Sequence, residues 1–446
     1  MEQEELDRPT IRRVILASSL GTLFEWYDFY LYGTLAVFFG ALFFPPGNEN
    51  AQLLESLATF GAGFGVRPLG AIVFGYIGDR IGRKYTFLIT MGTMGASTAA
   101  IGLLPTYDQV GLLATVLIVL LRLIQGLALG GEYGGAATYI AEHVPDERRG
   151  YYTSFIQTTA TLGFFLSLAV IGVARWGFGE AAFKANGWRV PFLVSFLLLA
   201  VSLYIRVRMR ESPLFARIKK EGTVSKNPLV ESFTNKVNLR YVVLALFGAT
   251  AGQAVVWYTG QFYALTFLQK SLGLDWHHAY LIVAIALAIT TPLFVVFGAM
   301  SDRIGRKKII LAGCALAALT YVPIYIGMAH FARPDSRSDV ALVALLAVQM
   351  VYVCMVYGPI AAFLVELFPT RIRYTSMSVP YHFGNGWFGG FLPLIATALT
   401  TSAFAKDLLG ANAIYAGLAY PILVCVITLV IGGLFIRETR DHKIDR

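Results

Sequence analysis

The chain has 446 residues, of which 56% are hydrophobic and only 14% are charged, and its mean hydropathy is +0.62. Soluble domains carry roughly a quarter charged residues, so this composition excludes an ordinary soluble protein and indicates a chain that lies mostly in lipid. The sequence has no CxxC motif, no HExxH motif and no Walker-type phosphate loop. We therefore expect no metal, no cofactor and no enzyme activity.

Apolar stretches recur along the whole chain, and a helix that crosses a bilayer needs about 20 mostly apolar residues. We expect twelve spans, at 15–43, 55–78, 85–104, 111–140, 152–174, 190–206, 240–269, 278–299, 308–330, 340–365, 374–401 and 413–436. The predicted fold class is therefore an all-α membrane protein with twelve transmembrane helices.

The net charge of +9 is distributed unevenly between the loops. When the loops are assigned alternately to the two sides of the membrane, one side receives only Arg175, Lys184, Arg189, Lys270, Arg333, Arg337 and Lys406. Lysine and arginine concentrate in cytoplasmic loops, so both termini are predicted to be cytoplasmic. The basic excess thus reflects orientation in the membrane, and we expect no nucleic-acid partner.

Two motifs occur twice, at an offset of half the chain. GYIGDRIGRK at 75–84 matches GAMSDRIGRK at 298–307, and EHVPDER at 142–148 is paired with ELFPTR at 366–371. Two matched pairs at nearly one offset indicate an internal duplication. We predict an N-terminal six-helix bundle at 1–206, a cytoplasmic linker at 207–239 and a C-terminal six-helix bundle at 240–446.

These repeated loops resemble the signature loops of the major facilitator superfamily, and RLIQGLALGGE at 122–132 resembles its helix-4 motif. EWYDF at 25–29 and RPLG at 67–70 resemble the metabolite:proton symporter branch, which includes carriers of 2-oxoglutarate, citrate, shikimate and proline or betaine. The resemblance implies an inner-membrane carrier with a substrate site between its halves, working by alternating access, and we expect this carrier to be a monomer. It implies symport of a small organic acid or related carboxylate with protons. A proton-independent sugar or polyol facilitator, or an exporter of the same fold, is the alternative.

Four ionisable residues within the predicted spans are candidates for proton coupling. Inserting a charged side chain at the centre of the bilayer costs at least about 2.5–3.5 kcal/mol of free energy, so a charge there indicates a function or a charged partner. Glu25 and Asp28 are three residues apart and share one helix face. The resemblance to sugar porters pairs Asp28 with Arg122, so that protonation of Asp28 releases Arg122; a permanent structural ion pair is the alternative. Glu132, in a glycine-rich helix, is a third acidic candidate.

Arg67, in the second span, is the principal substrate-binding candidate, because a guanidinium binds a carboxylate through two parallel hydrogen bonds. The alternative is that Arg67 pairs with Glu25 or Asp28 and does not meet the substrate. Further candidates are polar or aromatic residues within apolar runs. They are Gln157, Trp257, Tyr258, Gln261, Tyr263, His382, Asn385 and Trp387.

The repeated loops carry acidic residues beside arginines, and we expect them to form a cytoplasmic gate that closes when the carrier faces outward. The residues are Asp79, Arg83, Glu142, Arg148, Asp302, Arg306, Glu366 and Arg371. The alternative is that these charges only orient the loops in the membrane, which explains the basic residues but not their repeated acidic partners.

Overall fold

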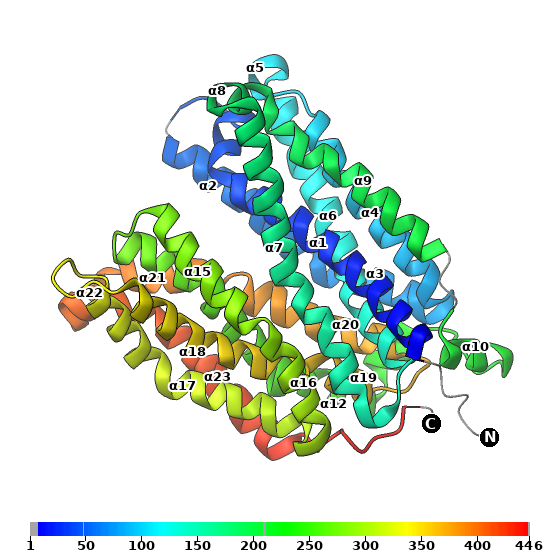
Figure 1. The fold of residues 1–446 in the computed structure, drawn as a ribbon. Coiled ribbons are helices and arrows are strands. Elements are labelled where there is room, and N and C mark those ends of the chain that lie inside the picture. The colour runs from blue at the N-terminus through cyan, green and yellow to red at the C-terminus, as the bar shows by residue number, and fades with distance from the viewer. Residues whose placement is uncertain (1–7, 48, 208–210, 445–446) are drawn as a thin grey trace.

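The computed structural model describes residues 8–47, 49–207 and 211–444, and these are helical almost throughout, with no strand among them. Figure 1 shows two groups of long helices, one from each half of the chain. The start of α1 and the last described residues of the chain lie at one end of the molecule (Figure 1), which we call the terminal face. The two groups approach each other near that face and diverge toward the other, the distal face, where α5 (Tyr107–Val110) and α22 (Ala403–Leu409) lie.

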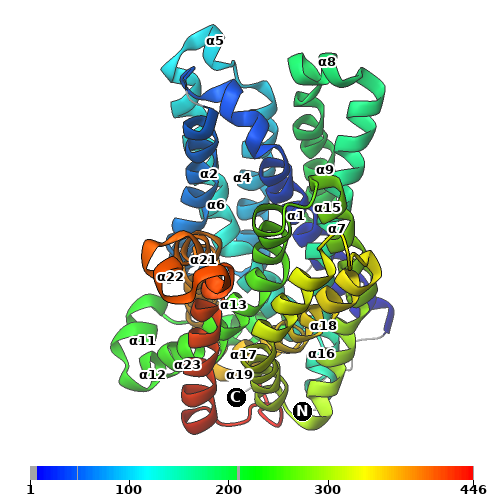
Figure 2. The ribbon, with the colours of Figure 1, turned by 90° about the vertical axis from the view of Figure 1, so that its left-hand side faces the viewer.

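The first half contains the six predicted spans as long helices, one of them broken. They are α1 (Arg8–Phe43), α2 (Glu49–Gly65) with α3 (Arg67–Arg80), α4 (Arg83–Leu103), α6 (Leu112–Ala141), α7 (Arg149–Phe178) and α9 (Arg189–Val207). The short α8 (Glu180–Ala182) precedes α9 on the distal face (Figure 2).

The break in the second span positions one charged side chain. Val66 separates α2 from α3, and Pro68 lies in the first turn of α3, where its missing N–H removes no helical hydrogen bond. Arg67 therefore begins a helix in the middle of the bundle. α6 packs against this break at close range, because a Cβ at Gly126 or Gly130 would overlap the backbone of Gly63 or Arg67. Glycine is required here by the close approach of two backbones.

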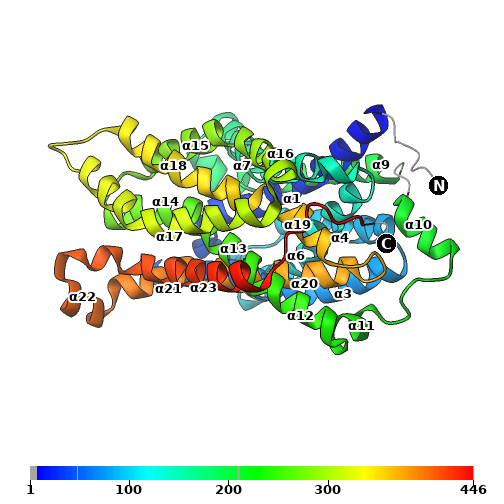
Figure 3. The same ribbon diagram turned by 90° about the horizontal axis from the view of Figure 1, so that it is seen from below.

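The segment between the halves forms two short helices, α10 (Pro213–Lys220) and α11 (Pro228–Thr234), each capped by a side chain, of Ser212 and Asn227 respectively. Figure 3 shows both at the outer edge of the molecule, α11 beside α3 and α10 at the terminal face. Residues 208–210 of the predicted linker lie outside the described part of the chain.

The second half repeats the six spans with more interruptions. They are α12 (Lys236–Ala245), α13 (Ala251–Tyr258) and α14 (Ala264–Thr266) in one segment, α15 (Trp276–Thr290) with α16 (Pro292–Ile304), α17 (Arg306–Phe331), α18 (Asp339–Tyr357) with α19 (Ile360–Leu367), α20 (Arg373–Phe383) with α21 (Leu392–Thr401), and α23 (Ala419–Phe435). Wider π-helical turns interrupt the first segment, including 259–263, and the turn 384–389 lies between α20 and α21.

Eight described helical segments are long and apolar enough to cross a membrane, and a ninth is found when the bent pair Glu180–Gly187 and Arg189–Ile205 counts as one span. The other three predicted spans are α1, which carries Glu25 and Asp28, and the interrupted segments α2–α3 and α20–α21. The two acidic residues make α1 less apolar, and the breaks divide the other two segments into shorter helices, although all three occupy the places that a twelve-helix repeat requires.

The two halves meet through equivalent helices. α3 packs against α20, and α7 packs against α16. The second and fifth spans of one half thus contact the fifth and second spans of the other, as expected for a two-fold pseudo-repeat.

Candidate functional site

A cavity lies between the halves, and both contribute its walls. The residues that line this central cavity are Thr22, Glu25, Trp26, Arg67, Leu129 and Tyr133 from the first half, and Trp257, Tyr258, Tyr357, Tyr381, His382 and Asn385 from the second. The space open to the centre of a water molecule is only ≈ 20 Å³. That is room for about one water, so a metabolite enters only when the walls move apart.

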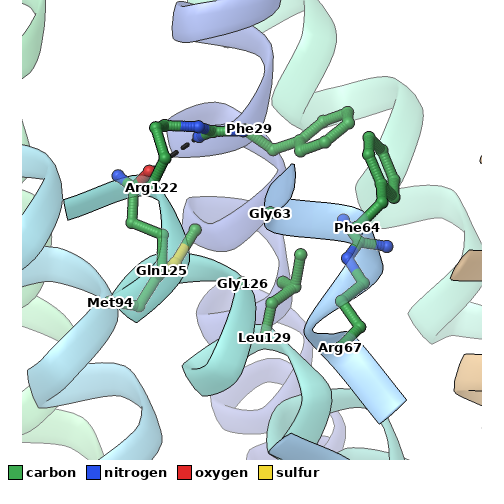
Figure 4. A pocket seen from close by; sticks show the side chains of 9 residues that line it. All are labelled: Phe29, Gly63, Phe64, Arg67, Met94, Arg122, Gln125, Gly126 and Leu129. Atoms are coloured by element: carbon green, nitrogen blue, oxygen red, sulfur yellow. Dashed lines mark hydrogen bonds between the residues drawn. The ribbon is translucent and has the colours of Figure 1, made fainter. Parts of the chain in front are cut away.

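Arg67 reaches this cavity without an ion-pair partner among the described residues. Its guanidinium lies over the ring of Phe64 at 4.2 Å and near that of Phe29 at 5.3 Å, and Figure 4 shows it beside the Phe64 ring. Glu25 contributes an attractive charge interaction. The side chain is 5% exposed, so a cation is held in the protein interior with mainly aromatic surroundings.

Asp28 lies away from the central cavity, inside the first half. It accepts a hydrogen bond of 2.6 Å from Ser195 and also interacts with Thr98 and with the charge of Arg122. Glu25 and Asp28 line one small internal space, and Glu25 also lines the central cavity. Glu25 is therefore the acidic group that joins the two spaces.

Arg122 is connected to Asp28 through two uncharged side chains. Arg122 donates to Gln125 at 2.6 Å, and Gln125 donates to Thr98 at 2.7 Å. Figure 4 shows the bond between Arg122 and Gln125 in the internal space that Arg67 also lines. The tyrosine ring of Tyr32 lies 4.3 Å from the Arg122 guanidinium. Sequence reasoning named the two charges but missed Gln125, which lies three residues after Arg122 on the same helix face.

Glu132 lies outside the central cavity. It is buried between α4 and α6 and accepts a hydrogen bond of 3.0 Å from Thr90.

Of the eight weaker substrate candidates, four line the central cavity: Trp257, Tyr258, His382 and Asn385. Asn385 exchanges hydrogen bonds with Gln253 at 3.2 and 3.1 Å. Both ring nitrogens of His382 lack a hydrogen-bond partner among the described residues.

The other four lie outside the cavity walls. Gln157 is one layer behind and donates to the Tyr133 hydroxyl at 2.7 Å. Gln261 and Tyr263 are buried farther along their segment, and Trp387 is 50% exposed. Gln261 and Tyr263 lie within the π-helical turn 259–263 and Trp387 within the turn 384–389, where side chains point in other directions than in a regular α-helix.

Four aromatic residues of the cavity are not among the candidate site residues: Trp26, Tyr133, Tyr357 and Tyr381. Tyr133 stacks on Tyr381 across the halves with ring centroids 3.7 Å apart, and the hydroxyls of Tyr357 and Tyr381 are hydrogen bonded. Helical spacing could have predicted Tyr133. It lies four residues after Leu129 on α6, on the helix face that also carries Arg122.

A charge network closes the terminal face on one side. Arg83 bonds Asp79 at 3.2 Å and Glu142 at 3.5 Å, and Arg373 of the other half bonds Glu142 at 2.9 Å. Asp79 also accepts hydrogen bonds from the backbone N–H groups of Tyr374 at 3.1 Å and Thr375 at 2.8 Å, in the first turn of α20. A carboxylate at a helix N-terminus is favoured by the helix dipole, so this network ties the halves together.

The second network repeats the first. Arg306 bonds Asp302 at 2.5 Å and Glu366 at 3.1 Å, and Arg149 of the first half bonds Glu366 at 2.9 Å. Asp302 accepts from the backbone N–H groups of Gly150 and Tyr151, both at 2.8 Å, in the first turn of α7.

Two of the eight gate candidates lie outside these networks. Arg148 is exposed, and its neighbour Arg149 makes the buried contact with Glu366. Arg371 is exposed and bonds Glu231 of the linker at 2.6 Å, whereas Arg373 makes the buried contact with Glu142. Which arginine faces inward depends on where α7 and α20 begin, and sequence alone leaves those starts uncertain by one or two residues.

Each network also contains a glutamate followed by a hydroxyl residue, and these residues were not predicted. Ser212 bonds Glu142, and Glu211 accepts from the backbone of Arg83 at 3.1 Å. In the other half Thr439 bonds Glu366 at 2.6 Å, and Glu438 accepts from the backbone of Arg306 at 2.7 Å. The sequence contains this repeat, as Glu-Ser after the sixth span and Glu-Thr after the twelfth, so it could have been predicted.

Two helical halves with equivalent contacts, a charged cavity between them and apolar membrane-length helices define a multi-pass membrane transporter for small molecules, not an enzyme. A family model described as Major Facilitator Superfamily matches residues 20–392. The chain therefore belongs to this superfamily.

Relatives of this chain are named as metabolite carriers. The Escherichia coli inner membrane metabolite transport protein YhjE is 36% identical over 90% of each chain. The Dickeya dadantii glycine betaine/proline/ectoine/pipecolic acid transporter OusA is 33% identical over 98% of this chain and 86% of its own. The Escherichia coli alpha-ketoglutarate permease is 34% identical over 87% of this chain and 88% of its own.

Among solved structures, the proton:xylose symporter XylE bound to 6-bromo-6-deoxy-D-glucose matches with a TM-score of 0.78, over 98% of each chain at 19% identity. This likeness supports the twelve-helix fold.

Proposed function

We propose that this chain is a secondary active transporter that moves a carboxylate-bearing metabolite together with protons. The observation that carries the proposal is Arg67, a buried guanidinium that lines the central cavity and has no ion-pair partner among the described residues. An arginine in that position is suited to a carboxylate, which it binds through two charge-assisted hydrogen bonds. Relatives named for alpha-ketoglutarate and for glycine betaine and proline support a carboxylate-bearing substrate.

The coupled ion in this proposal is a proton, which Glu25 receives from the central cavity and shares with Asp28. The adjacent internal space that both carboxyl groups line supports such a transfer. Neutralising Asp28 weakens its attraction to Arg122, and the Thr98–Gln125 connection passes the change to that arginine. Intramembrane carboxyl groups are the usual elements of proton relays in transporters. Glu132, bonded to Thr90 away from the cavity, is assigned a packing role.

The two charge networks act in this proposal as the gate of an alternating-access cycle. They hold the halves together on the terminal face, while the helices diverge toward the distal face. We assign the terminal face to the cytoplasm, because the basic loops lie there and basic residues stay inside. The chain is then a monomer in a bacterial-type inner membrane, with both termini cytoplasmic.

A thermal-stability screen of the purified chain near pH 5.5 and pH 7.5, against carboxylates, zwitterions and sugars, tests the proposal. A ligand at 100 times its dissociation constant adds about 2.7 kcal/mol of stability. Stabilisation by carboxylates, stronger at the lower pH and absent in Arg67→Gln, is the expected result. Stabilisation by sugars alone, equal at both values, would support a proton-independent facilitator instead.

A further inference from the structure

His382 offers two unused hydrogen-bonding atoms at the central cavity. The residue lines the cavity from α20 and is 2% exposed, and neither ring nitrogen has a partner among the described residues. A buried polar group without a hydrogen bond costs about 1–3 kcal/mol, so its partner normally comes from elsewhere. A neutral imidazole provides one donor and one acceptor.

Two further donors at the same cavity have no hydrogen-bond partner within the described part of the chain: the Nε of Arg67 and the Nε1 of Trp257. The hydroxyls of Tyr133 and Tyr357, by contrast, are bonded to Gln157 and Tyr381. Together with His382, the unsatisfied nitrogens supply three donors and one acceptor. A ligand that satisfies them must present mainly acceptor oxygens, as a carboxylate and a hydroxyl or carbonyl do. An ammonium group presents donors or no hydrogen-bonding atom at all.

The charges around the cavity limit how many carboxylates it accommodates. Among the described residues that line the cavity, Arg67 is the one arginine or lysine, and Glu25 is the one aspartate or glutamate. The charge of Arg67 acts on the His382 ring, so a second positive charge there would be repelled. With a proton on Glu25 and one carboxylate on Arg67 the charges balance. A second carboxylate would leave one negative charge unbalanced in the protein interior, which is costly.

We infer that the substrate carries a single carboxylate together with a hydroxyl or carbonyl oxygen, and that His382 recognises this second oxygen. The inference rests on the proposed function, because it takes Arg67 as the group that binds the carboxylate. The rings of Trp26, Trp257 and Tyr258 then cover the carbon skeleton.

The test compares matched acids that differ by one hydroxyl, such as cyclohexanecarboxylate and its 3-hydroxy derivative or propionate and lactate, with succinate and glycine betaine alongside. Their affinities for the full-length purified chain are measured by calorimetry. The unsubstituted chain should bind the hydroxy acid of at least one pair roughly tenfold more tightly than its parent acid, as one hydrogen bond to a buried group provides. His382→Ala should lose this preference, so that the two acids of the pair bind with equal affinity.

His330→Ala is the matched control, because His330 is exposed at the end of α17, outside the cavity. It should keep the preference for the hydroxy acid. If His382→Ala fails to fold, His382→Asn keeps a donor and an acceptor on a shorter side chain, and it should show a reduced preference.

Two results overturn the inference alone: a hydroxyl preference that is undiminished in the His382 variants, or tighter binding of succinate or glycine betaine than of every hydroxy acid. In both cases the proposed function stands if Arg67→Gln abolishes the binding that remains. If the unsubstituted chain binds no carboxylate at all, the inference and the proposed function both fail.

Discussion

Asp79 and Asp302 each bind the first backbone N–H groups of a helix that belongs to the opposite half of the molecule. They lie 223 residues apart in equivalent loops. Asp79 binds α20 and Asp302 binds α7, so each half is held to the other by the same carboxylate–backbone hydrogen bonds. A carrier that alternates between two states has to release both contacts when the terminal face opens.

Asp79→Asn should favour the state that is open at the terminal face, because the amide removes the charge that the helix N-terminus and Arg83 attract. The loss of about 1–2 kcal/mol corresponds to a shift of roughly 5- to 30-fold in the population of states. A cysteine at Thr138, which contacts Met377 across the halves, reports opening by its labelling rate. Asp302→Asn should act in the same direction. Unchanged labelling in both variants would remove these contacts from the gate.

Gly78→Ala should weaken the same closed interface by steric overlap. A Cβ at Gly78 would overlap the ring of Tyr374, whose hydroxyl bonds the Gly131 carbonyl in α6. The ring or α20 must shift, and a cost of about 1–3 kcal/mol is expected. Gly92→Ala on α4, where a Cβ meets open space, is the matched control and should be neutral or slightly stabilising. Equal melting temperatures for the two variants would contradict the packing described.

Glu142 lies one residue beyond the end of α6, outside the membrane-spanning helix. Burial alone raises the pKa of its carboxyl, but the charges of Arg83 and Arg373 and the Ser212 hydroxyl outweigh burial and place the pKa below its ordinary value of 4.5. A depressed carboxyl pKa contributes stability that is fully present above the ordinary value and is lost as the pH falls through the depressed value.

We therefore expect the melting temperature to fall in acid partly through Glu142, and Glu142→Gln to show a shallower fall between about pH 5 and pH 3. Asp339→Asn serves as the control, since Asp339 lies at the exposed start of α18 and pairs with Arg337, and it should keep the original slope. Identical slopes for Glu142→Gln and the unsubstituted chain would show that the carboxylate does not stabilise the closed network.

Gln125→Ala should reduce coupling while leaving substrate binding intact. It removes the side chain that connects Arg122 to Thr98 and Asp28, and Gln125 does not line the central cavity. Uphill accumulation driven by a pH gradient should fall roughly tenfold, since about 1.4 kcal/mol of hydrogen bonding is lost, with an unchanged dissociation constant for the substrate. Full accumulation would show that the connection carries no coupling.

The sequence predicted the spans, the duplication and most of the charged residues of the cavity and the networks. Each of these rests on a pattern of residues that can be read without a structure. The repeated DRIGRK loops place Asp79 and Asp302 in equivalent positions whatever the details of packing. The rotation of each helix about its own axis, which decides which side chains face the interior, could not be predicted in this way. A start of α7 or α20 displaced by one or two residues exchanges Arg148 for Arg149 and Arg371 for Arg373. Gln261, Tyr263 and Trp387 lie within π-helical turns and outside the cavity lining, and no local residue pattern predicted those turns.

The central claim is proton-coupled transport of a carboxylate through the cavity that Arg67 and Glu25 line. The most direct measurement is the proton flux that accompanies uptake of a labelled carboxylate into proteoliposomes containing the purified chain, with Asp28→Asn as the comparison. The account predicts that added substrate makes the external medium more alkaline in proportion to uptake, and that Asp28→Asn loses uphill accumulation. Uptake without proton movement, or full accumulation by Asp28→Asn, would contradict it.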